Sequence, residues 1–98
     1  MQPLRQGDVL LIPTSETVKG TKLPHLTLAE GEVTGHRHCI SQGEAELYER
    51  HGTLYLKVLS PTALLTHEEH QPITIPKGDW MVRIQREYEP KGWRYVAD

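Results

Sequence analysis

Apolar residues in this chain recur mostly at every second position, which is the spacing of a half-buried β-strand and not that of a helix. In TLYLKVL, residues 53–59, leucine and valine alternate with tyrosine and lysine. The preceding run EAELYER, residues 44–50, alternates in the same way. Gly52 lies between the two runs and supplies a tight turn. The pattern therefore predicts a β-hairpin that joins residues 44–50 to residues 53–59.

Short apolar runs bounded by glycine or proline make up most of the remaining chain. Because 8 glycines and 7 prolines are spread along the sequence, few windows are long enough for a helix. Strands separated by such turn residues are typical of small all-β domains. We therefore predict an all-β fold, a small single-domain β-barrel or sandwich of short antiparallel strands over residues 1–98. The further strand segments are DVLLIP (8–13), HLTLAEGEVTG (25–35, broken at Gly31), PTALLTH (61–67), PITIP (72–76) and DWMVRIQREY (79–88), whereas TSETVKGTKLP (14–24) is predicted to be a loop.

The charge and hydropathy of the sequence indicate whether nucleic acids or membranes are expected partners. The formal net charge is −2, from 11 basic and 13 acidic residues, and neither sign dominates a long stretch. This makes nucleic acid an unfavoured partner, because phosphate binding needs a basic stripe. The sequence has neither an 18-residue apolar run nor a secretory signal core, so we expect no membrane association. The single cysteine, Cys39, fits a reducing compartment, and we expect a cytoplasmic protein.

Candidate chemistry enters with the segment GEVTGHRHCI, in which two histidines are separated by one residue. Residues two apart on a strand face the same side, with Cα atoms about 6.5–7 Å apart. His36 and His38 would therefore share a face with Ile40, while Arg37 and Cys39 lie opposite. If Ile40 faces the interior, the two imidazoles do so as well. Buried imidazoles need a polar partner, and a metal ion is a natural one.

A second histidine pair follows in HEEHQP, where His67 and His70 flank Glu68 and Glu69. Because Pro72 makes a long helix unfavourable, we expect His67 to end a strand and His70 to lie in the loop that follows. We predict that all four histidines are metal ligands and that Glu68 or Glu69 acts as a ligand or a general base. This donor set suits a divalent transition metal, and Zn, Ni, Mn and Fe all remain candidates.

The remaining histidines and the cysteine have simpler interpretations. His51 lies in the predicted hairpin turn, where it is expected to be solvated. His25 follows Pro24 in a loop and is compatible with either role. Cys39 has the soft sulfur of a metal ligand, but strand alternation turns it away from the histidine pair. A small buried side chain is therefore the favoured interpretation of Cys39.

The H-x-H pair on a strand, a glutamate a few residues later and the IPKG turn together resemble the cupin pattern. In cupins, a first motif supplies two histidines and a glutamate to a metal inside a small β-barrel, and a later strand supplies a third histidine. The resemblance implies that His36 and His38 match the histidine pair and that Glu44 matches the carboxylate. The PKG at residues 76–78 has no histidine after it, and His67 and His70 precede it.

The wider layout of GDVLLIP, GEVTGHRH and THEEHQPITIPKGDWMVRIQREYEP is similar to that of small uncharacterised bacterial and phage proteins. This resemblance covers most of the chain. It implies no known activity.

Two functions compete most directly. The first is a metal-binding β-barrel that acts on a small molecule, in which three protein ligands leave an open position where the metal can activate water. The second is a non-catalytic binding or assembly module, whose metal is structural or absent. Aromatic and arginine side chains near the C-terminus support the second function, because both are enriched at interfaces. These residues are Trp80, Tyr88, Trp93 and Tyr95 with Arg83, Arg86 and Arg94, and Trp80 also fits a core position.

A third function uses the same C-terminal residues to bind single-stranded nucleic acid by stacking. Its acidic neighbours Asp79, Glu87 and Glu89 weaken the positive field, so it ranks last. Exposed strand edges in a small sheet invite pairing, which also makes a homodimer an expectation for this chain.

Overall fold

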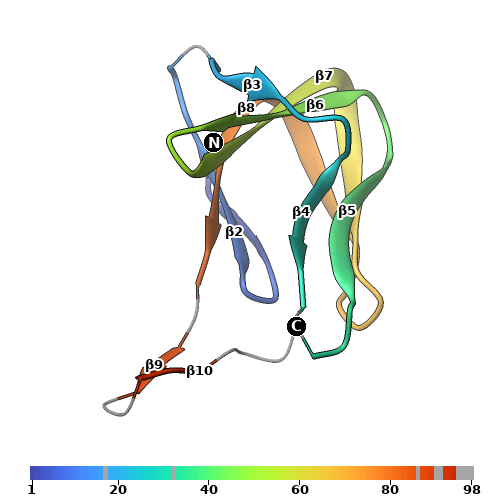
Figure 1. Ribbon diagram of the computed structural model, residues 1–98. Helices are drawn as coiled ribbons and strands as arrows, with labels where there is room; N and C mark the ends of the chain where they lie inside the picture. Colours follow the sequence, from blue (N-terminus) through green and yellow to red (C-terminus); the bar gives the residue numbers. More distant parts are fainter. Residues whose placement is uncertain (17, 32, 86, 90–91, 95–98) are drawn as a thin grey trace.

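The chain folds into antiparallel strands in the computed structural model, which describes residues 1–16, 18–31, 33–85, 87–89 and 92–94 (Figure 1). No described residue is helical, so the predicted all-β class is confirmed. Side chains are described within residues 1–85. The strands of the main sheet are β1 (Leu4–Gln6), β2 (Val9–Pro13), β3 (Thr21–Lys22), β4 (Thr27–Glu30), β5 (Arg37–Gln42), β6 (Ala45–Arg50), β7 (Thr53–Thr66) and β8 (Ile73–Ile84).

One sheet of eight strands contains all of these elements, and β7 is its longest strand. The strand order is β1-β2-β8-β7-β5-β4, and β6 pairs with both β7 and β3. The first half of β7 pairs with β6 and its last residues pair with β5, while β8 runs along its other side. The sheet bends around its own inner face but does not close into a barrel. Of the two predicted arrangements, the closed barrel is therefore wrong.

The hairpin predicted from alternation is confirmed. β6 and β7 pair in continuous register from Ala45↔Val58 to Arg50↔Thr53. His51 and Gly52 form the turn with φ angles of 51° and 79°. Two consecutive positive φ angles are the requirement of the two-residue turn that matches strand twist. His51 is exposed there, as expected.

Several strands differ from the sequence prediction. β1 (Leu4–Gln6) was not predicted, and β3 (Thr21–Lys22) falls within residues 14–24, which were predicted to be a loop. Residues 53–59 and 61–67 were expected to be separate strands, but β7 continues through Pro61. The segments 72–76 and 79–88 likewise merge into β8. The β7–β8 register shifts between Val58 and Thr62, so Pro61 lies where the ladder is already interrupted and its missing N–H is tolerated.

The apolar core lies on the concave face of the sheet and draws on most of its strands. Trp80 is fully buried, and its indole N–H donates to the carbonyl of Pro76 over 3.1 Å. The expectation that Trp80 is a core residue is therefore confirmed. The buried apolar residues are Val9, Leu11, Leu28, Ile40, Leu47, Leu56, Val58, Ala63, Leu65, Ile75, Trp80 and Val82.

The C-terminal segment forms a separate two-stranded hairpin of β9 (Glu87–Glu89) and β10 (Gly92–Arg94). Its side chains, with those of Arg86 and Tyr95, lie outside the described part of the chain. The interface and nucleic-acid functions that rest on Tyr88 and Trp93 therefore stay predictions.

Two leucines on β7 test the assignment of the core. We expect Leu56→Ala to destabilise the protein by about 2–5 kcal/mol. The substitution leaves a cavity in the core next to Trp80, which is the partner of Leu56 on β8. Leu59→Ala is the matched control on the same strand, since Leu59 is 39% exposed whereas Leu56 is 0% exposed. The control should cost no more than about 0.5 kcal/mol. Urea unfolding of both variants measures the difference, and equal losses would contradict this core.

Candidate metal centre

Three connections of the sheet meet at one end of the molecule. They are the turn between β1 and β2, the segment between β4 and β5, and the segment between β7 and β8 (Figure 1). Each connection carries candidate polar residues: Gln6 to Asp8 in the first, His36 in the second, and His67 to His70 in the third. The fold therefore collects at one place residues that are distant in sequence.

The structure brings all four predicted histidines into one cluster. The ring centroid of His67 lies 4.2 Å from that of His38, 4.6 Å from that of His70 and 5.6 Å from that of His36. The centroids of His38 and His70 are 5.9 Å apart. Two imidazoles that bind one ion tetrahedrally have centroids about 5 Å apart, given metal–nitrogen distances of about 2.0–2.1 Å. The centroid separations in the cluster, 4.2–5.9 Å, lie around this value.

Strand alternation places His38 inside, as predicted. His38 is fully buried on β5 and shares its inward face with Ile40, while Arg37 is exposed on the opposite face. Cys39 also lies on the opposite face, where it lines a shallow hollow with Arg37 and His67. Cys39 is therefore on the other face of β5 from His38. His36 precedes the first residue of β5 and is half-buried.

Gln6 is a buried member of the site that the sequence pattern did not indicate. Its side-chain amide nitrogen donates to the carbonyl oxygens of Leu65 and Gln71, each over 2.9 Å. Its amide oxygen lies 2.9 Å from Nδ1 of His38. One buried amide therefore ties β1 to the end of β7, to the loop after it and to β5.

Asp8 was also missed, and it faces the other nitrogen of His38. Its Oδ1 lies 3.3 Å from His38 Nε2, and both atoms are buried. Two donor atoms that lie about 2.1 Å from one ion at a tetrahedral angle are about 3.4 Å apart. The separation of these two atoms is therefore that of two ligands of a common ion.

His70 packs directly on the turn that carries Asp8. A Cβ atom added at Gly7 would lie 2.5 Å from His70 Nε2, so only glycine leaves room for this ring. The φ angle of Gly7 is 58°, which also favours glycine. His70 Nε2 is buried and has no hydrogen-bond partner among the described residues. Burial of an imidazole nitrogen without a partner is unfavourable, so a bound ligand would stabilise this position of His70.

The two glutamates of HEEH have different surroundings. Glu68 Oε1 accepts the backbone N–H of Arg37 over 2.9 Å. This bond lowers the pKa of Glu68, and the backbone N–H of Glu68 itself adds to the effect. Glu69 Oε1 instead lies 3.2 Å from Nδ1 of His36. Glu68 therefore fastens the loop to β5, and Glu69 is the carboxylate that lies beside the cluster.

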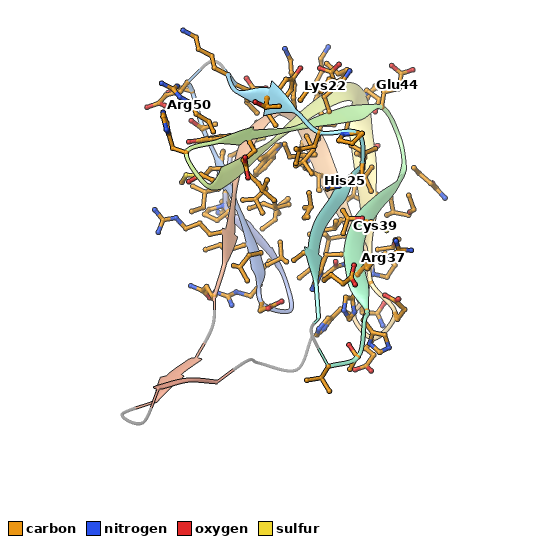
Figure 2. All side chains as sticks on the ribbon, in the orientation of Figure 1. Lys22, His25, Arg37, Cys39, Glu44 and Arg50 are labelled. Atoms are coloured by element: carbon orange, nitrogen blue, oxygen red, sulfur yellow. The ribbon has the colours of Figure 1, made fainter. Side chains whose placement is uncertain are left out.

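The donor atoms are close together but not yet arranged around a point. Among the residues that the structure describes, no three His, Cys, Asp or Glu side chains are already placed to hold an ion. Rotation of one or more imidazole rings would have to accompany binding. Glu44, the carboxylate implied by the cupin resemblance, lies beyond the far end of β5 from Arg37 and is not brought to the histidines (Figure 2).

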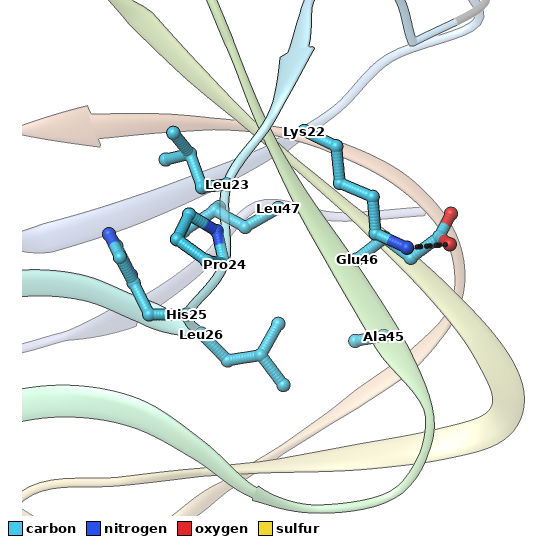
Figure 3. Close-up of a pocket in the computed structure, with 8 residues that line it drawn as sticks. All are labelled: Lys22, Leu23, Pro24, His25, Leu26, Ala45, Glu46 and Leu47. Atoms are coloured by element: carbon cyan, nitrogen blue, oxygen red, sulfur yellow. Dashed lines mark hydrogen bonds and ion pairs between the residues drawn. The ribbon is translucent and has the colours of Figure 1, made fainter.

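A second hollow lies near β3 and β6, away from the histidine cluster (Figure 3). Lys22 Nζ binds Glu46 Oε2 over 2.9 Å there, and the Tyr48 hydroxyl donates to Glu46 Oε1 over 2.8 Å. The bond from Lys22 is the main reason that the pKa of Glu46 is lowered. The charged groups of this hollow already bind each other, so the histidine cluster is the better candidate site. Its lining residues are Lys22, Leu23, Pro24, His25, Leu26, Ala45, Glu46 and Leu47.

Comparison with known families gives one match. Residues 5–85 match a family described as a domain of unknown function, DUF8820. The chain belongs to this family. The matched range contains all four histidines of the cluster together with Gln6 and Asp8. Neither the curated proteins nor the solved structures gave a match. The described residues include no helix long and apolar enough to cross a membrane.

The contact between Gly7 and His70 can be tested by substitution. We expect Gly7→Ala to destabilise the protein more than Gly52→Ala, because both add a left-handed alanine but only the first displaces an imidazole. The left-handed strain alone costs roughly 1–2 kcal/mol. Urea unfolding gives the stabilities, and NMR of the imidazole protons reports the position of His70. Equal losses with unchanged His70 resonances would contradict the described packing.

Proposed function

We propose that this protein binds a divalent transition metal at the three-loop end of its sheet, with Asp8, His38 and His70 as its central ligands. The observation that carries the proposal is the separation of 3.3 Å between Asp8 Oδ1 and His38 Nε2, both buried. If the hydrogen of a neutral His38 is on Nδ1, directed at Gln6 Oε1, the lone pair of Nε2 faces the carboxylate oxygen and the two repel each other. A cation between them, either a proton or a metal ion, turns the repulsion into attraction.

The surroundings favour a metal ion over a proton. A proton would satisfy Asp8 and His38 but would leave His70 Nε2 buried without a partner among the described residues. A metal ion can bind all three groups at once. Two imidazoles and one carboxylate are the donor set of catalytic zinc sites and of non-haem iron(II) sites, and both keep open coordination positions. Zn, Ni, Mn and Fe therefore remain the candidate metals.

An open position supports an enzymatic role toward a small molecule. Asp8, His38 and His70 would hold the ion with a coordination position left over, and the chemistry it would supply there is activation of a water molecule as a nucleophile. Glu69, beside His36, is the carboxylate best placed to accept a proton near the site. Glu68 is less suited to this role because its carboxylate is held by the backbone of Arg37. The proposal places the protein in the cytoplasm, where the thiol of Cys39 stays reduced.

A structural metal is the second candidate function, and one observation favours it. The cluster joins three connections of an open sheet, so an ion there would also hold those connections together. A structural ion has a closed coordination shell and contributes directly to folding. The two functions make opposite predictions about the protein without its metal.

Metal titration tests the site itself. We expect Zn²⁺ to bind one per chain in isothermal titration calorimetry of untagged protein, and His38→Ala to remove this binding because it deletes a central ligand. His51→Asn is the matched control, since His51 is exposed in a turn that asparagine also tolerates. The control should bind like the natural protein. Failure of Zn²⁺, Ni²⁺, Mn²⁺ and Fe²⁺ alike to bind the natural protein would contradict the proposal.

Chelation separates the catalytic from the structural role. Because the apolar core draws on β2, β4, β5, β6, β7 and β8 and includes none of the histidines, we expect the metal-free protein to stay folded with a lower Tm. Circular dichroism melting with and without a chelator measures this. Loss of the sheet at room temperature after chelation would contradict the catalytic role and establish a structural ion.

A further inference from the structure

Two of the four histidines differ in the hydrogen-bond partner of Nδ1: one Nδ1 faces an acceptor and the other faces a donor. At His38, Nδ1 faces the side-chain oxygen of Gln6. At His67, Nδ1 faces the backbone N–H of Glu69 over 3.0 Å. The first partner can only accept a hydrogen and the second can only donate one. Each partner therefore dictates which nitrogen of its imidazole carries the hydrogen.

The orientation of Gln6 is determined by groups outside the cluster. Its amide nitrogen donates to the carbonyls of Leu65 and Gln71, each over 2.9 Å, which uses both of its hydrogens. Exchanging the nitrogen and oxygen positions would point an oxygen at two carbonyl oxygens. Since Gln6 is only 3% exposed, water cannot compensate for that exchange. The amide oxygen must face His38, so His38 donates from Nδ1 and a neutral ring has its lone pair on Nε2.

The same reasoning gives the opposite result at His67. The backbone N–H of Glu69 is an obligatory donor, so Nδ1 of His67 must hold a lone pair. The hydrogen of a neutral His67 is then on Nε2, which is buried. The ring of His67 contacts those of His36, His38 and His70.

We propose that His38 and His67 have opposite tautomers and therefore different roles. His38 is a metal ligand through Nε2, and His67 is a hydrogen-bond donor through Nε2–H. This inference rests on the proposed metal site, and it removes His67 from the four ligands predicted from the sequence. Gln6 is the positioning residue of His38, because its oxygen keeps the hydrogen of a neutral ring on Nδ1 and leaves the lone pair on Nε2, which faces Asp8. The ring of His67 lies 4.2 Å from that of His38, between ring centroids, so its N–H belongs to the surroundings of the ion and not to its ligand set.

The assignment of tautomers can be tested without any metal. We would record long-range ¹H–¹⁵N spectra of the imidazoles in metal-free protein, about two pH units above the ordinary histidine pKa of about 6.5. Loss of signals in His38→Gln and His67→Gln assigns the two rings. We expect His38 to carry a hydrogen on Nδ1 and His67 to carry one on Nε2 alone. A bare Nδ1 at His38 or a protonated Nδ1 at His67 would overturn the inference, whether or not the protein binds metal.

Zn²⁺ titration then tests the division of roles. Gln6→Leu should weaken Zn²⁺ binding about 10–100-fold, as loss of a second-layer partner does, and shift His38 toward the Nε2–H form. His67→Gln keeps a donor and should weaken Zn²⁺ binding less than tenfold, whereas His38→Ala abolishes it.

Gln42→Leu is the control for Gln6→Leu, since Gln42 is exposed at the end of β5. If His67→Gln abolishes binding as His38→Ala does, His67 is a ligand and the inference is wrong. If no variant or natural protein binds Zn²⁺ while the tautomers are as assigned, the proposed metal function fails and the tautomer assignment stands.

Discussion

The buried amide of Gln6 is the interaction on which the arrangement of the site depends. Its three hydrogen bonds, each 2.9 Å long, reach β5, the end of β7 and the loop before β8. The loop at residues 67–71 and the turn at Gly7 are not joined by strand pairing, so this amide, together with the packing of His70 on Gly7, holds one against the other. A buried amide with all its groups bonded stabilises one geometry, because any other leaves polar groups without partners. The positions of His38, His70 and Asp8 follow from that geometry.

The resulting cluster buries several imidazole and carboxylate atoms at one end of the sheet. Nitrogens of all four histidines and one oxygen of Asp8 are withdrawn from water at the same end of the molecule. Burial of such groups is unfavourable unless they bind something. The apolar core contains none of these residues, so hydrophobic packing alone does not explain why they are buried together. The proposed metal ion would bind imidazole and carboxylate together and would account for both features.

The sequence predicted the parts of the site that depend on local pattern. Alternation in the segment with His36 and His38 correctly put His38 on the inner face with Ile40, and it correctly turned Cys39 away. Gln6 and Asp8 were missed because their contacts join residues far apart in the chain, and no local periodicity reports such contacts. The only signal was a polar–glycine–polar turn between two short apolar strands. The long β7 and β8 were divided in prediction because prolines interrupt strands in general, whereas here Pro61 lies in an irregular stretch of the ladder.

The most direct test of this account is X-ray absorption spectroscopy of the protein loaded with one equivalent of Zn²⁺. The account predicts a low-coordinate ion with imidazole nitrogens and a carboxylate oxygen at about 2.0–2.2 Å, and the outer-shell scattering of two rings from His38 and His70. The imidazole contribution should fall in His38→Ala. A shell made of oxygen atoms alone, without imidazole scattering, would contradict the central claim that this end of the sheet is a metal centre.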